Sequence, residues 1–229
     1  MDRTLLAHFG KPKVFLPVIH PISPDAAHEA IDVARDAGAD GVFLINQGMR
    51  ATALLLLLEE VRTIHPDLWL GVNLLGREPA RVFELVRDLG VRGIWVDNAT
   101  KVDLDEVTRD HPSRPLLFGG VGFKYQPSVQ LHHLPYFAQD ALRRGVDVVT
   151  TSGEATGEAA SLGKVRAIGA GLDGKPLGLA SGVTPENVVE YLPFVDAFLV
   201  ASGIEREFGV LDPDKTRRLA EEIHGWTAP

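Results

Sequence analysis

Two short segments near the end of the chain finish an apolar run with the same sequence, Ala-Ser-Gly. The first ends at Gly182 and the second at Gly203. Glycine lets the backbone approach an anion closely, and the N–H groups of such a turn can donate to phosphate oxygens. A single Ser-Gly pair is usually only a tight turn, whereas two such pairs at adjacent positions favour a phosphate site. We therefore expect phosphate to bind at Ser181, Gly182, Ser202 and Gly203.

Three ionisable residues that follow other apolar runs are candidates for catalysis: Lys124, Asp97 and Glu154. A desolvated lysine can form a Schiff base or accept a proton. Lys124 can equally hold a phosphate or a carboxylate, or pair with Asp97 or Glu154. The two carboxylates suit general acid or base work, but Asp97 and Asn98 also suit a helix cap, and Glu154 lies in a glycine-containing loop. The sequence leaves these roles open.

Other polar side chains at the ends of apolar runs are expected to contact a substrate. Amides can bind sugar hydroxyls or a base edge, and a histidine can titrate near neutrality, although a structural role is commoner for a single histidine. The adjacent pair His132-His133 has the wrong spacing for two ligands on one helix face. We predict no cofactor and no protein metal site, while Mg²⁺ could arrive with a phosphorylated ligand. The expected substrate contacts are His20, Asn46, Gln47, Asn73, Tyr125, Thr151 and Ser152.

Eight short apolar runs recur along the chain, and each is followed by a turn and a segment with helical spacing. Such runs without polar alternation are typical of parallel strands buried on both faces. Glycines at 38, 90 and 145 are placed to stop helices, and Ser23-Pro24 and Thr184-Pro185 are placed to start them. The predicted strands are Val14–Ile19, Gly41–Ile45, Trp69–Val72, Gly93–Val96, Leu116–Gly120, Asp147–Thr150, Leu177–Ala180 and Ala197–Val200.

Eight evenly distributed units predict an α/β fold, a single (β/α)₈ TIM barrel that spans residues 1–229 as one domain. A doubly wound sheet uses the same units, but no glycine-rich dinucleotide fingerprint follows the first strand. No linker divides the chain. In a barrel, the polar residues named above gather at one end, because functional side chains lie where the strands finish.

Composition limits the classes of function. The formal charge of −8 argues against a nucleic-acid polymer as partner, and the absence of cysteine excludes disulfides and thiolate chemistry. The longest apolar run, Ala53–Leu58, is too short to span a bilayer, and the first residues resemble no export signal. We expect a cytoplasmic protein that binds a small phosphorylated metabolite, does not bind a membrane, and forms a homo-oligomer.

Several stretches resemble one known family. They are Gly71–Leu75, Phe118–Lys124, Asp147–Gly157, Ala180–Val188 and Val195–Glu205. Over almost the whole chain these residues are similar to the BtpA/SgcQ-like family of phosphate-binding (ribulose-phosphate-binding) TIM barrels. The resemblance implies a barrel with a phosphorylated ligand, and the family is linked to photosystem assembly in one branch and to sugar-phosphate metabolism in another. Residues 16–22 and 123–126 depart from the family pattern, which indicates a distinct subgroup.

Two hypotheses about function follow. The first is an enzyme that acts on a small phosphorylated sugar or nucleotide held by the turns after the seventh and eighth strands. Its reaction type stays open between isomerase, lyase and glycosyl-bond chemistry. The alternative is a non-catalytic sensor of a phosphometabolite, or an assembly factor of the BtpA type.

Overall fold

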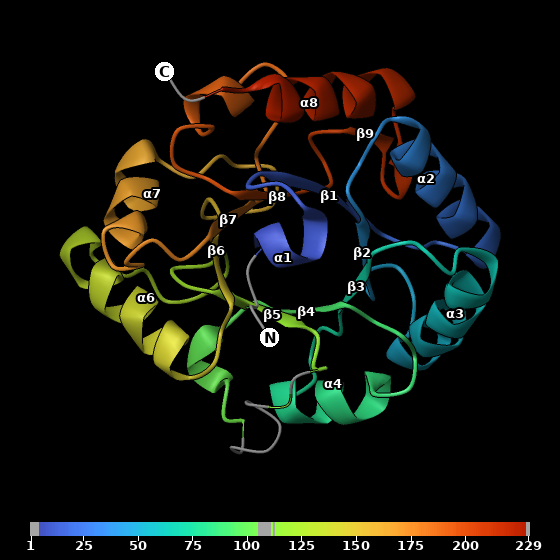
Figure 1. Cartoon of the computed structure of the whole chain (residues 1–229), viewed down its shortest axis with the longest axis horizontal. Helices are drawn as coiled ribbons and strands as arrows, with labels where there is room; N and C mark the ends of the chain where they lie inside the picture. Colours follow the sequence, from blue (N-terminus) through green and yellow to red (C-terminus); the bar gives the residue numbers. More distant parts are fainter. Residues whose placement is uncertain (1–4, 105–110, 112, 228–229) are drawn as a thin grey trace.

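A computed structural model describes residues 5–104, 111 and 113–227, and in it eight parallel strands close into a barrel. The strands follow one another around the barrel in sequence order, and β1 closes it by pairing with β8 (Figure 1). This confirms the predicted TIM barrel fold. The strands are β1 (Val14–Ile19), β2 (Val42–Ile45), β3 (Leu70–Asn73), β4 (Gly93–Val96), β5 (Leu116–Gly120), β6 (Val148–Thr151), β7 (Leu177–Ala180) and β8 (Ala197–Val200).

Strand ends differ from the predicted ones by a single residue at three strands. Strands β2, β3 and β6 each begin one residue later than predicted, and β3 and β6 also end one residue later. Asn73 and Thr151 are therefore the last residues of β3 and β6, rather than the first residues of the following turns.

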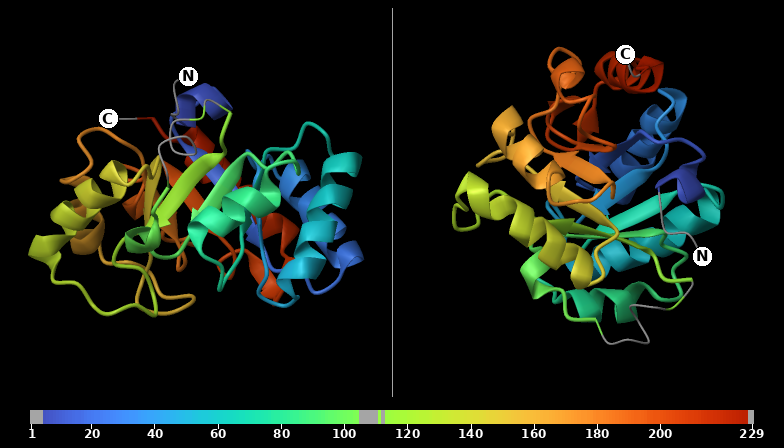
Figure 2. Two further views of the ribbon diagram at one scale, coloured as in Figure 1. Left: turned by 90° about the horizontal axis from the view of Figure 1, so that it is seen from below. Right: turned by 60° about the vertical axis from the view of Figure 1, so that its left-hand side comes forward.

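Helices surround the barrel on its outside (Figures 1 and 2). The N-cap of α2 is as predicted, because Ser23 Oγ accepts a hydrogen bond from Ala26 N at 3.1 Å and Pro24 is the first helical residue. Gly38 follows this helix with φ of 84°, the left-handed conformation that ends a helix. The outer helices are α2 (Pro24–Asp36), α3 (Ala51–Ile64), α4 (Pro79–Val86), α6 (Leu134–Arg143), α7 (Leu162–Gly169) and α8 (Pro213–Gly225).

The predicted helix start at Thr184-Pro185 is wrong. Residues 185–187 form a turn, and only a short 3-10 helix, η3 (Val188–Glu190), follows before β8. Thr184 Oγ1 accepts from Glu186 N at 3.2 Å as a cap would. The side chain of Asn187 accepts from Thr184 N and donates to the Gly182 carbonyl, so it satisfies this segment locally as a turn.

Aromatic side chains fill the inside of the barrel. Phe43 makes edge-to-face contacts with Trp69, Trp95 and Phe118, with ring centroids 5.1 to 5.9 Å apart. The next residues along each strand point outwards and pack against the helices, which produces a second core layer. The barrel interior is therefore filled with side chains and does not form a channel.

One end of the barrel is closed by the short helix α1 (Leu5–Phe9), which lies across it in Figures 1 and 2. Leu5 belongs to the same buried cluster as Val14 and Leu116, the first residues of β1 and β5, and the ring centroids of Phe9 and Trp69 are 4.9 Å apart. The plugged end is thus the amino end of the strands. Side chains at the carboxyl end remain available for a ligand.

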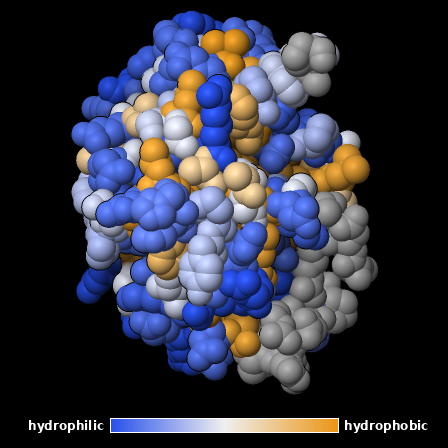
Figure 3. All heavy atoms as spheres, turned by 90° about the vertical axis from the view of Figure 1, so that its left-hand side faces the viewer, coloured by the Kyte–Doolittle hydropathy of each residue, from blue (hydrophilic) through white to orange (hydrophobic). Residues whose placement is uncertain are grey.

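A small hairpin follows β8 at this open end. It consists of β9 (Glu205–Glu207) and β10 (Val210–Leu211), which pair antiparallel. Within the described ranges, no helix is long and apolar enough to cross a membrane. The face formed by α6 and α7 is mainly hydrophilic, with apolar groups separated from one another (Figure 3).

Candidate functional site

Two neighbouring cavities open at the carboxyl end of the strands. The lateral cavity, about 330 Å³, is lined by Asn73, Asp97, Lys124 and Tyr125 together with residues of the β3–α4 loop. The central cavity, about 30 Å³, lies over the barrel axis. Trp95 and Lys124 line both cavities, so they form the wall between two parts of one opening. The central cavity is lined by Val18, His20, Ile45, Gln47, Trp95, Lys124, Thr156, Ser181, Leu199, Ala201 and Ser202.

Asp97 is held at the mouth of the barrel by a neighbouring amide. Asn73 Nδ2 donates to Asp97 Oδ1 at 2.9 Å, and the Gln126 amide donates to the backbone carbonyl of Asp97. Burial raises the pKa of Asp97, although the Asn73 bond and the charge of Lys124 oppose this. The helix-capping alternative belongs instead to Asn98, whose Oδ1 accepts from Thr100 N at 2.9 Å. The Asp97 carboxyl therefore faces the lateral cavity.

Lys124 carries its amine between the two cavities. Burial lowers the pKa of Lys124, and the charge of Asp97 opposes that effect. Lys124 Nζ donates to Thr156 Oγ1 at 3.4 Å. Opposite shifts in a lysine and a carboxyl bring their two pKa values closer together, a pattern that favours proton transfer at a site.

The turn after β5 sets the position of Lys124. Gly120 lies so close to the Asp97 carbonyl that a Cβ atom would be 2.0 Å from that oxygen, so only glycine fits. Ser152 Oγ then accepts from Lys124 N at 2.8 Å, and Tyr125 adopts a left-handed φ of 60°. Tyr125 Oη also donates to Thr156 Oγ1 at 3.1 Å. The β5 and β6 loops thus hold the lysine from both sides.

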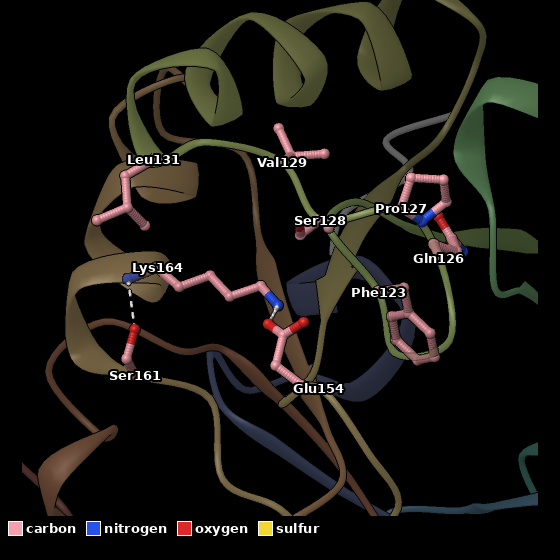
Figure 4. Close-up of a pocket in the computed structure, with 10 residues that line it drawn as sticks. Phe123, Gln126, Pro127, Ser128, Val129, Leu131, Glu154, Ser161 and Lys164 are labelled. Atoms are coloured by element: carbon pink, nitrogen blue, oxygen red, sulfur yellow. Dashed lines mark hydrogen bonds and ion pairs between the residues drawn. The ribbon is translucent and has the colours of Figure 1, made fainter.

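Glu154 does not pair with Lys124. Its carboxylate instead contacts Lys164 Nζ at 3.0 Å, and Figure 4 shows the two side chains pointing toward one another. Lys164 is buried in α7 and also donates to the Ser152 carbonyl at 2.9 Å. This pair lines a third cavity of about 140 Å³, together with Phe123 and Gln126. Glu154 therefore lies outside the lateral and central cavities, and its catalytic role stays a prediction.

The turns after β7 and β8 meet the β6–α7 loop. Ser181 has a φ of 79°, and its Oγ accepts from Gly157 N at 3.0 Å and donates to the Ala155 carbonyl at 3.3 Å. A methyl group placed on Gly157 would lie 3.8 Å from Ser202 Oγ, so Gly157, Ser181 and Ser202 converge.

Within the described residues, the backbone N–H groups of Ser181, Gly182, Ser202 and Gly203 make no hydrogen bond. Four unused donors in two adjacent turns form a suitable environment for an anion.

The two glycines of these turns are also required by packing. A Cβ on Gly182 would lie 2.2 Å from the Glu158 backbone, and a Cβ on Gly203 would lie 1.8 Å from the Val183 carbonyl. Close approach of neighbouring loops therefore accounts for both glycines without any ligand. The unused N–H groups, rather than the glycines themselves, are the feature that indicates an anion.

The remaining predicted contacts fall into two groups. His20, Gln47, Asn73 and Tyr125 line the cavities, whereas Asn46, Thr151 and Ser152 do not. Asn46 exchanges hydrogen bonds with the backbone of Leu75, and its Oδ1 accepts from Leu75 N at 2.6 Å. Thr151 and Ser152 are fully buried, and Ser152 orients Lys124.

The sequence reasoning missed several site residues because their signals are weak. Trp95 lies within an apolar strand and has the sequence pattern of a core residue. Thr156 and Gly157 lie in a loop whose path the sequence does not define. Lys164 lies on α7, and Glu205, whose carboxylate lies 2.9 Å from His20 Nδ1, lies on β9, so neither residue directly follows a strand of the barrel. Among residues 5–104, 111 and 113–227, no group of three or more histidine or acidic side chains is placed to hold a metal ion.

Comparison with known proteins gives matches only among solved structures. No protein-family model matches the chain, and no curated protein matches it either. (S)-3-O-geranylgeranylglyceryl phosphate synthase from Thermoplasma acidophilum, in complex with its substrate sn-glycerol-1-phosphate, has a TM-score of 0.68 at 15% identity, covering 99% of this chain and 100% of that one.

Two further matches are thiamine phosphate pyrophosphorylase from Pyrococcus furiosus and phosphoribosyl anthranilate isomerase from Thermus thermophilus. The first has a TM-score of 0.67 at 17% identity, covering 93% of this chain and 97% of that one. The second has a TM-score of 0.64 at 18% identity, covering 93% and 98%. All three are enzymes named for a phosphorylated compound, and at these identities the likeness shows that this chain shares their barrel fold.

Proposed function

We propose that this chain is an enzyme that acts on a small phosphorylated sugar or nucleotide, whose phosphate binds to the turns after β7 and β8. The observation that carries the proposal is the set of four unused backbone N–H donors at Ser181, Gly182, Ser202 and Gly203, beside a cavity that contains Lys124. Barrels recurrently bind phosphate at the loops after strands 7 and 8. The phosphorylated compounds named for the structural neighbours support the same substrate class.

The reactive part of the substrate would lie towards Lys124 and Asp97. These two groups line the lateral cavity, whose volume of about 330 Å³ suits a small metabolite. Their pKa values are displaced towards each other, so either group can exchange a proton with a ligand between them. Isomerisation, carbon–carbon cleavage and glycosyl-bond chemistry all require such a transfer. Mg²⁺ could accompany the phosphate.

Four further parts of the proposal rest on the sequence. We propose that the chain belongs to the BtpA/SgcQ-like family, is cytoplasmic and forms a homo-oligomer. We also propose that residues 1–229 form a single domain, of which residues 1–4, 105–110, 112 and 228–229 lie outside the described part.

A ligand screen tests the proposal. Sugar phosphates, nucleotides and their unphosphorylated counterparts would be compared by thermal shift, and each hit would then be followed by NMR for conversion. We expect only the phosphorylated compounds to raise the melting temperature of the protein, and we expect at least one of them to be converted. Binding without conversion across a broad set would favour the sensor hypothesis, and equal binding of unphosphorylated compounds would contradict the phosphate site.

A further inference from the structure

His20 and Glu205 form a buried pair on the side of the mouth opposite Asp97. His20 follows β1 directly, and its Nδ1 lies 2.9 Å from Glu205 Oε1 on β9. Both side chains are only 8% exposed. The same carboxylate oxygen accepts from Gly209 N at 3.1 Å, which fixes it within the β9–β10 hairpin. The carboxylate therefore has a defined position when it meets the imidazole.

The imidazole ring of His20 is held by an aromatic neighbour as well as by Glu205. Phe208 stacks on it with ring centroids 4.8 Å apart and an interplanar angle of 16°. Because a carboxylate can only accept, the neutral ring must carry its proton on Nδ1 and leave a lone pair on Nε2. Within the described part of the chain, nothing hydrogen-bonds to His20 Nε2, and His20 lines the central cavity with Lys124, Ser181 and Ser202.

We infer that His20 is a further proton-transfer group of the site, which acts together with Lys124, and that Glu205 is the positioning residue that holds its tautomer. This inference rests on the proposed function and narrows it to the isomerisation of a phosphorylated hydroxy-carbonyl compound. His20 and Lys124 line the central cavity with Ser181 and Ser202, and Lys124 also lines the larger lateral cavity. A ligand with its phosphate at the two serine turns and its body in the lateral cavity would therefore have its first carbons near His20 and Lys124.

The proton balance of this reaction is simple. His20 Nε2 takes a proton from the carbon beside the carbonyl group, and the electrons of that C–H bond form the carbon–carbon double bond of an enediol. The carbonyl oxygen takes a proton from the Lys124 ammonium. In the second half, the hydroxyl on the carbon that lost its proton returns a proton to Lys124, and the imidazolium delivers its proton to the former carbonyl carbon. Both side chains end as they began, and no oxidant or cofactor is consumed.

Isotope exchange tests this role directly. The phosphosugar panel would be incubated in D₂O with the wild-type protein, His20→Gln and Glu205→Gln, and incorporation of deuterium beside the carbonyl group would be followed by NMR. We expect His20→Gln to lose about 100-fold or more of the exchange rate, as removal of a general base does, with phosphate affinity within about threefold of wild type. Glu207→Gln is the matched control, because Glu207 is an exposed carboxylate on the same strand, and it should exchange at the wild-type rate.

Glu205→Gln separates positioning from a purely structural role. Glutamine keeps a carbonyl oxygen at the position that accepts from both Gly209 N and His20 Nδ1, but it removes the negative charge that stabilises the imidazolium. We therefore expect exchange to slow about tenfold or more with KM nearly unchanged. Nitrogen NMR of the His20 ring should show the proton on Nδ1 in the wild type and in this variant, so that slower exchange in Glu205→Gln reports the lost charge and not a displaced ring. A wild-type ring with its proton on Nε2 would overturn the inference whether or not a variant folds.

The outcomes also separate the inference from the proposed function. Undiminished exchange in His20→Gln overturns the role of His20 and leaves the phosphate enzyme standing. Phosphosugar binding without exchange in the wild type overturns isomerisation while the phosphate site survives. If no phosphorylated compound binds, both are overturned.

Discussion

Ser202→Glu places a negative charge in the proposed phosphate site without disturbing the surrounding protein. Ser202 is exposed, and no described residue hydrogen-bonds to its hydroxyl. Its Oγ lies close to Gly157 and lines the same cavity as Ser181, so a longer side chain at this position projects beside the anion. The free energy of unfolding should therefore stay within about 0.5 kcal/mol of wild type.

The effect on binding follows from Coulomb repulsion. For a carboxylate and a phosphate dianion about 5 Å apart, the repulsion is about 1.7 kcal/mol with the dielectric constant of water, and about 6.6 kcal/mol with an effective value of 20. A factor of ten in Kd corresponds to about 1.4 kcal/mol, so the lower figure already predicts about 15-fold weaker binding.

The assay is a calorimetric titration of inorganic phosphate or a sugar phosphate at about pH 8, where the second phosphate proton is lost, and at low ionic strength, because salt screens exposed charges. Ser128→Glu is the matched control. Ser128 is an exposed serine at the same end of the barrel, outside both the central and lateral cavities. Equal phosphate affinities for Ser202→Glu and wild type, or an equal loss in Ser128→Glu, would refute the placement of the phosphate.

Three further predictions concern stability. Burial raises the pKa of Asp97 in the folded protein, so the wild type loses stability as the pH rises through that pKa. In urea titrations, Asp97→Asn should therefore have a higher free energy of unfolding than the wild type from about pH 4 upward. Asp40 behaves oppositely: burial raises its pKa, but bonds from His224, Lys11 and the Phe15 amide lower it overall. Asp40→Asn should therefore lose about 1.5–3 kcal/mol near neutrality, and little below about pH 3, by the same titrations; a pH-independent loss would contradict this. Gly203→Ala should lower the melting temperature and cost about 1–3 kcal/mol of stability, because the new Cβ would lie 1.8 Å from the Val183 carbonyl in the turn after β7; an unchanged melting curve would show that the two turns are packed differently.

The strands and their ends could be predicted from the sequence for a physical reason. A strand buried on both faces needs a continuous apolar run, and the polar residue that follows it marks the carboxyl end. Gly38 and Gly145 could be identified as helix ends in the same way, because the left-handed backbone conformation that ends a helix strongly favours glycine. Closure of the barrel then brought Lys124, Ser181 and Ser202 to one cavity, as expected for residues at strand ends.

Contacts that depend on the path of a loop could not be predicted. Glu154 pairs with Lys164 because the β6–α7 loop folds back over the third cavity, and no spacing rule describes that path. His20 and Glu205 are 185 residues apart and meet only because β1 pairs with β8 and the hairpin after β8 turns inward. The helix predicted to start at Thr184 does not form, because the Asn187 side chain accepts from Thr184 N and donates to the Gly182 carbonyl and so stabilises a turn.

Amide NMR during a phosphate titration tests the central claim most directly. With the backbone resonances assigned, inorganic phosphate should shift the amides of Ser181, Gly182, Ser202 and Gly203 along one saturable curve, because these N–H groups have no other partner in the described structure. The Gly157 amide, which already donates to Ser181, should shift less. Saturable shifts centred on another part of the barrel, or no saturable shift in these two turns, would contradict the account.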